Sequence, residues 1–150
     1  MSLVIGIVGT AKNTGKTTTT SALLDELNKM NIRIGLTSIG YDGEELDNIT
    51  GLPKPRLLLK KGMVVATAQK SLSAATAGYN VLDTTDISTP LGKIIIVEIT
   101  QRGFMIIAGP NKGRELRFIL DKMIRNQLCD FIIVDGALNR MAPMAETDCL

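Results

Sequence analysis

The sequence predicts an α/β fold, a three-layer sandwich built around a largely parallel sheet. Three observations lead to this fold class: short runs of apolar, β-branched residues, stretches with helical spacing, and the alternation of the two along the chain. A length of 150 residues with 45% apolar residues suits one domain with a sizeable core. We therefore expect residues 1–150 to form a single domain.

The first half of the predicted sheet comes from two apolar runs separated by a helix. Leu3–Val8 is continuous, apolar and β-branched, as in a strand that is covered on both faces. Residues 15–30 carry apolar side chains at helical spacing, and Ile32–Ile39 returns to the strand pattern. Glycines and prolines then predict a long loop over residues 40–61, and loops of this length are usually functional.

The middle of the chain gives shorter patterns. Met63–Ala66 predicts a short strand, and the Ala- and Ser-rich residues 67–77 predict a helix that Gly78 would end. Two further runs, 93–100 and 104–108, are separated by a turn and have the pattern of a hairpin.

The clearest helical pattern lies near the end of the chain, where Asn111 is placed to cap the helix. Phe131–Gly136 follows as another buried strand, and it ends in an acid. The apolar face of the helix consists of Leu116, Ile119, Leu120, Met123, Ile124 and Leu128.

The composition excludes several classes of function. The chain has no histidine, which rules out a Ser-His-Asp system, a Cys-His nucleophile and imidazole metal ligands. A net charge of +2 and 3% aromatic residues are too little for a nucleic-acid platform. We expect no nucleic-acid partner.

The sequence also predicts a cytoplasmic protein without a membrane partner. Cys129 and Cys149 lie far apart and form no zinc or disulfide pattern, so reduced thiols are expected. The apolar runs are far shorter than the roughly 20 residues that span a bilayer. Leu3–Gly9 has no basic segment before it, which excludes a signal peptide.

One motif carries most of the functional information. A loop of backbone N–H groups that opens onto a helix N-terminus suits a chain of phosphates. Gly15 allows close approach, Lys16 would contact the outer phosphates as a catalytic residue, and the Thr17 hydroxyl is placed to ligate Mg²⁺. The predicted nucleotide-binding loop, between the first strand and the first helix, is Gly9-Thr10-Ala11-Lys12-Asn13-Thr14-Gly15-Lys16-Thr17-Thr18.

Acidic residues complete the predicted site. Asp135 ends an apolar strand, and a carboxylate there belongs at the ligand edge of a parallel sheet. Asp42 lies in the predicted loop 40–61, where it would orient the attacking water as a catalytic residue or reach Mg²⁺ through water. A solvated acidic loop is the alternative interpretation of Asp42 and of its neighbours Glu44, Glu45 and Asp47.

These motifs resemble those of P-loop NTPases. The spacing from Gly9 to Gly15 is one residue longer than in the commonest phosphate loop and resembles that of dethiobiotin synthetase. The same class contains signal-recognition GTPases, Min-type ATPases and adaptor proteins of molybdenum-cofactor synthesis. Asp130–Ala137 looks like the second motif of this class, and by that resemblance Asp135 holds Mg²⁺ directly or through water. The resemblance implies a Rossmann-like P-loop fold, an Mg²⁺ cofactor, and ATP or GTP as the nucleotide.

The chain departs from these relatives at two places. Min-type proteins carry a signature lysine at the position of Ala11, so lysine-mediated dimer activation is not indicated. Dethiobiotin synthetase has an Asp at that position and a substrate lysine where this chain has Thr37-Ser38-Ile39, which argues against its carboxylation chemistry.

Four stretches are also similar to the N-terminal part of reactivase subunits of cobalamin-dependent lysine aminomutases. This second resemblance implies a partner enzyme. The stretches are Gly9–Thr17, Thr37–Asp47, Gly51–Arg56 and Val134–Arg140.

Together these patterns predict Mg²⁺-dependent binding and hydrolysis of ATP or GTP, acting as a switch or chaperone for a partner enzyme such as a cobalamin-dependent aminomutase. A metabolic kinase or ATP-dependent ligase of the dethiobiotin synthetase type stays open, as do a non-catalytic binding module and a homodimer. The chain ends soon after 131–136, without a further strand to complete a nucleotide-binding sheet. We therefore expect an incomplete part of a longer protein.

Overall fold

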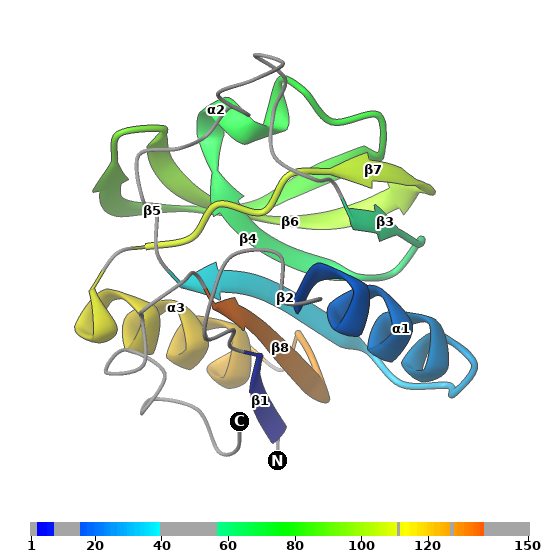
Figure 1. Ribbon diagram of the computed structural model, residues 1–150. Helices are drawn as coiled ribbons and strands as arrows, with labels where there is room; N and C mark the ends of the chain where they lie inside the picture. The colour runs from blue at the N-terminus through cyan, green and yellow to red at the C-terminus, as the bar shows by residue number, and fades with distance from the viewer. Residues whose placement is uncertain (1–2, 8–15, 40–56, 111, 127, 137–150) are drawn as a thin grey trace.

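The computed structural model describes residues 3–7, 16–39, 57–110, 112–126 and 128–136. Its main feature is a six-stranded sheet (Figure 1), in the order β1-β8-β2-β4-β6-β5. The strands of this sheet are β1 (Leu3–Ile7), β2 (Ile34–Ile39), β4 (Val64–Ala68), β5 (Gly78–Thr89), β6 (Gly92–Gln101) and β8 (Phe131–Gly136). A second sheet and three helices complete the described part: β3 (Leu57–Leu59), β7 (Gly103–Met105), α1 (Lys16–Asn28), α2 (Gln69–Leu72) and α3 (Gly113–Arg125).

The six-stranded sheet is mixed, with mostly parallel neighbours. β8 pairs in parallel with both β1 and β2, and β2 pairs in parallel with β4. β6 is antiparallel to both β4 and β5. The helix α1 returns the chain from β1 to β2, as a parallel connection requires, whereas a tight turn suffices between β5 and β6. The α/β prediction is confirmed, with an antiparallel half that the sequence patterns did not indicate.

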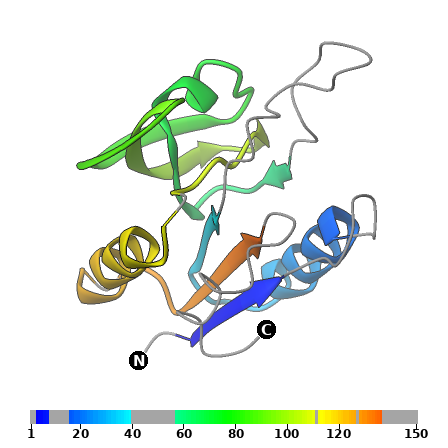
Figure 2. The same ribbon diagram turned by 60° about the vertical axis from the view of Figure 1, so that its left-hand side comes forward.

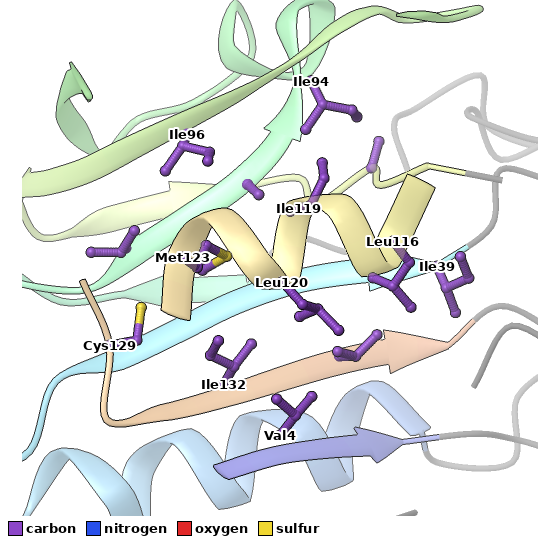
Figure 3. Close-up of a cluster of buried hydrophobic side chains, with 14 of the residues drawn as sticks. Val4, Ile39, Ile94, Ile96, Leu116, Ile119, Leu120, Met123, Cys129 and Ile132 are labelled. Carbon is purple, nitrogen blue, oxygen red and sulfur yellow. The ribbon is translucent and has the colours of Figure 1, made fainter. Parts of the chain in front are cut away.

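Helices α1 and α3 lie on opposite faces of the parallel half (Figure 2). Successive side chains of a strand point to opposite faces, and β8 shows this division. Ile132 and Val134 belong to the core cluster of α3, whereas Ile133 belongs to that of α1. The α3 cluster is shown in Figure 3. Because both faces are covered, the strands consist of continuous apolar runs.

The small sheet of β3 and β7 covers the antiparallel half on the same side as α1. Leu57, Leu59 and Met105 from this small sheet pack in one cluster with Val97 and Ile99 of β6. Residues 57–59 were expected within the long loop, and residues 40–56 of that loop lie outside the described residues.

The expected helix over 67–77 is mostly wrong. Thr67 and Ala68 belong to β4, the helix α2 spans only Gln69–Leu72, and Gly78 opens β5 instead of ending a helix. The helix propensity of Thr67 and Ala68 does not decide their structure, because both residues pair with β6 as part of β4.

The expected hairpin of 93–100 with 104–108 is also wrong. β6 pairs with β4 and β5, while the shorter β7 pairs with β3. β5 was not predicted because it is a sheet edge with a mostly exposed surface, so its sequence lacks a buried alternation.

The last helix is confirmed, and most of its predicted apolar face is buried, although Ile124 is only partly buried and Leu128 lies beyond the end of α3. Leu116, Ile119 and Leu120 are fully buried. The residue that precedes the helix is Lys112, whose side chain makes no capping bond, and Asn111 lies outside the described residues. In the described part of the chain, no helix has the length and apolarity needed to cross a bilayer.

The amino ends of β2 and β8 are joined by an ion pair. Arg33 Nη2 lies 3.2 Å from Asp130 Oδ1, and the Arg33 backbone N–H donates to Asp130 Oδ2 at 3.1 Å. The side-chain bond to Arg33, followed by the backbone bond, lowers the pKa of Asp130 below its usual 3.8, and the Asp130 bond raises the pKa of Arg33.

We expect Asp130→Asn to lower the melting temperature at neutral pH, because Asn cannot supply the charge that Arg33 pairs with. The lowered pKa of Asp130 contributes stability that is present above its usual pKa of 3.8 and is lost as the pH falls through the folded-state value. Thermal unfolding measured from pH 7 to pH 3 should therefore show that the difference in melting temperature between the wild type and Asp130→Asn becomes smaller as the pH falls. A difference in melting temperature that stays constant over this pH range would contradict a stabilising role of the Arg33–Asp130 ion pair.

We expect Gly35→Ala to destabilise the protein by about 1–3 kcal/mol, the usual cost of overpacking. A Cβ at Gly35 would lie 2.6 Å from Cys129 Sγ and 2.8 Å from Met123 Cε. Urea unfolding measures the loss, and Cys129→Ala provides the matched background because it removes the nearest atom. The cost of Gly35→Ala should be smaller in that background; an equal cost would exclude the contact as its cause.

Candidate functional site

The parallel strands end at one edge of the sheet, and this carboxyl edge gathers the described part of the predicted site. In the register of the sheet, Asp135 of β8 pairs with Ile7 on one side and with Ser38 on the other. Asp135 therefore lies beside the last residue of the strand that leads into the predicted phosphate loop. The sequence placed this acid at the carboxyl end of a central strand, and the register agrees.

Helix α1 begins at the same edge. Because α1 joins two strands that point the same way, it must run back across the sheet and start where β1 ends. Lys16 is its first residue, and Thr17 and Thr18 follow in its first turn. The positive end of the helix dipole therefore lies at the edge where Asp135 stands.

The rest of the predicted phosphate loop, Gly9–Gly15, lies outside the described residues. The same is true of Asp42 and of the acids that follow it, Glu44, Glu45 and Asp47. The role of Asp42 stays a prediction.

Helix α3 starts at this edge as well, on the other face. Figure 3 shows Leu116, in the first turn of α3, beside Ile39 at the end of β2. Two helices thus begin on opposite faces of the sheet, with the ends of β8 and β2 between them. In open α/β sheets, ligands bind in the crevice outside the carboxyl ends of the strands at such a place.

In the described part of the carboxyl edge, the carboxylate that β8 offers to a divalent ion is that of Asp135. Among the described residues, no group of three or more His, Cys, Asp or Glu side chains is arranged to hold a metal. Mg²⁺ is usually held by one or two carboxylates together with water and substrate phosphates. Asp135 is one carboxylate of this kind at the carboxyl edge.

The described cysteine is not a candidate nucleophile. Cys129 is buried beside Gly35, away from the carboxyl edge, and burial raises the pKa of its thiol to about 12. Burial thus disfavours the thiolate form of Cys129, and this residue is not a nucleophile for the carboxyl edge.

Sequence reasoning missed two polar residues at the edge, Ser38 and Thr67. Each is the penultimate residue of a buried strand, and each side chain is buried. A hydroxyl inside an otherwise apolar strand was the available signal, because a buried hydroxyl needs a hydrogen-bond partner.

Comparison with models of known protein families, with curated proteins and with solved structures finds no match for this chain. Its function is therefore argued from the site itself.

Proposed function

We propose that this chain binds a nucleoside triphosphate with Mg²⁺ at the carboxyl edge of its parallel strands, and that it hydrolyses the nucleotide as a switch or chaperone for a partner enzyme. The observation that carries the proposal is the pairing of Asp135 with Ile7. This pairing brings an acid from the last described strand next to the strand that precedes the Gly9–Thr18 motif.

The distances of a sheet suit this arrangement. Neighbouring strands lie about 4.8 Å apart, so the end of β8 is one strand spacing from the end of β1. An ion held at Asp135 would therefore lie close to phosphates bound at the start of α1. Thr17, in the first turn of α1, would supply a hydroxyl ligand to the same ion.

The chemistry needs little from the protein beyond position and charge. Phosphoryl transfer is catalysed by placing the reactants and stabilising the charge on the transferred group. The Lys16 ammonium would carry the charge opposite the outer phosphates, Mg²⁺ would bridge them, and Asp42 would orient the attacking water. This set of groups requires no histidine, which agrees with the composition.

Either ATP or GTP satisfies the proposal, because the motif contacts phosphates and not the base. The partner enzyme is proposed from the similarity to reactivase subunits, which makes a cobalamin-dependent aminomutase the first candidate. A switch of this kind turns over slowly alone and faster with its partner.

We expect Lys16→Ala to weaken nucleotide binding by about 100-fold, because a charged hydrogen bond to phosphate is lost. Isothermal titration calorimetry with ATP and GTP in the presence of Mg²⁺ measures the effect. Lys29→Ala is the matched control. Lys29 is an exposed lysine directly after the carboxyl end of α1, and among the described contacts its side chain pairs only with Glu26. Unchanged affinity in Lys16→Ala would refute the proposed function.

We expect Asp135→Asn to remove most of the gain in affinity that Mg²⁺ gives, about tenfold, while binding in EDTA stays as in the wild type. Calorimetry with and without Mg²⁺ measures this difference. Asp130→Asn is the control, because Asp130 directly precedes the amino end of β8, whereas Asp135 lies near its carboxyl end. If the Mg²⁺ effect survives in Asp135→Asn, the metal is held elsewhere.

A further inference from the structure

A short segment of chain lies between the carboxyl ends of β2 and β4. These strands pair only at two positions, Gly35 with Val64 and Leu36 with Val65. Beyond them, the backbone N–H of Ala68 donates to the carbonyl of Ala108 at 2.8 Å, so another segment takes the place of the neighbouring strand. We call this segment, residues 106–110, the strap.

Two buried hydroxyls hold the strap. Ser38 Oγ accepts the Gly109 N–H at 2.8 Å and donates to the Ile107 carbonyl at 3.2 Å. Thr67 Oγ1 accepts the Ala108 N–H at 2.9 Å and donates to the Ile106 carbonyl at 3.1 Å. Each hydroxyl thus satisfies one backbone donor and one backbone acceptor of the strap.

The approach of the strap to β2 is as close as a backbone permits. A Cβ at Gly109 would collide with the carbonyl oxygen of Ser38, so only glycine fits at this position. The strap also crosses the edge of the sheet, because Met105 before it packs on the α1 side and Ala108 within it packs on the α3 side. It therefore fixes where α3 begins.

We propose that the strap is a positioning element of the triphosphate site and that Ser38 is the residue that holds it there. The inference rests on the proposed function. Asp135 pairs with β1 on one side and with Ser38 on the other, so an ion at Asp135 would lie about one strand spacing from Ser38, and outer phosphates bound to that ion could extend toward β2. The strap is bonded to Ser38 and forms the wall beyond them.

In this proposal, the wall would lie on the side from which the terminal phosphate is attacked. Attacking and leaving oxygens are roughly in line in phosphoryl transfer, so the water must approach from beyond the outer phosphate. The water oxygen bonds to the terminal phosphorus as the bond to the bridging oxygen breaks. Nucleoside diphosphate and inorganic phosphate leave, and the proton of the water passes to phosphate. A fixed strap limits where this water stands.

The strap should therefore affect turnover and not diphosphate affinity. Ser38→Ala removes both bonds from the Ser38 hydroxyl. We expect the rate of phosphate release in a single turnover to fall about tenfold or more, while the dissociation constant of Mg²⁺–nucleoside diphosphate stays within about twofold. Thr67→Val removes the two bonds from the Thr67 hydroxyl to the strap. It should also slow phosphate release without changing the diphosphate affinity, so the inference stays testable if one of the two variants does not fold.

Thr85→Val is the matched control. The buried Thr85 hydroxyl also donates to one carbonyl, of Ile94 at 2.8 Å, and accepts one N–H, of Ile87 at 3.3 Å, but it lies on β5 at the far side of the sheet. Its phosphate release and diphosphate affinity should both stay within about twofold of the wild type, because Thr85 lies on the edge strand farthest from β1 and its hydroxyl does not bond the strap.

The outcomes separate the two proposals. Wild-type chain that binds neither ATP nor GTP overturns the proposed function and the strap inference with it. Wild-type chain that binds nucleotide but releases no phosphate overturns the hydrolysis in the proposed function together with the strap inference. Where the wild type both binds and hydrolyses the nucleotide, the role of the strap alone is overturned if Ser38→Ala releases phosphate at the wild-type rate, or if Thr85→Val slows the release equally.

Discussion

The parallel, in-register pairing of β8 between β1 and β2 is the constraint on which the rest of this structure depends. β8 is the last described strand of the chain, yet it is inserted between two of the first. This insertion sets Asp135 between Ile7 and Ser38. Without it, Asp135 would not lie beside the end of β1, and the described groups that are proposed to bind Mg²⁺ and phosphate would not meet.

The three parts of β8 have different surroundings. Its amino end follows Asp130, which is tied to Arg33 at the surface. Its middle is fully buried and divides its side chains between the cores of α1 and α3. Its carboxyl end is less buried and carries Asp135. Burial of the middle of β8 therefore stabilises the strand, and the stable strand holds Asp135 in a fixed position at the carboxyl edge of the sheet.

The antiparallel half of the sheet contributes to the site through the strap. β6 and β7 carry the chain to the α1 side, and residues 106–110 bring it back over the edge to α3. The bonds from Ser38 and Thr67 are then the link between the two halves. In the proposed arrangement, the segment that follows the antiparallel strands would form one wall of the triphosphate site.

The sequence by itself determined the local features whose signal is local. Buried strands such as Phe131–Gly136 are visible as apolar runs, α3 as an apolar face, and Asp135 as an acid at a strand end, because each depends only on residues near one another in the chain. Tertiary structure alone decided the rest. β5 is held by its pairing with β6, residues 67–68 join a strand because β6 lies beside them, and Ser38 meets Gly109 only after β2 and β4 diverge. These features depend on contacts between distant segments, and no periodicity in a single segment encodes them.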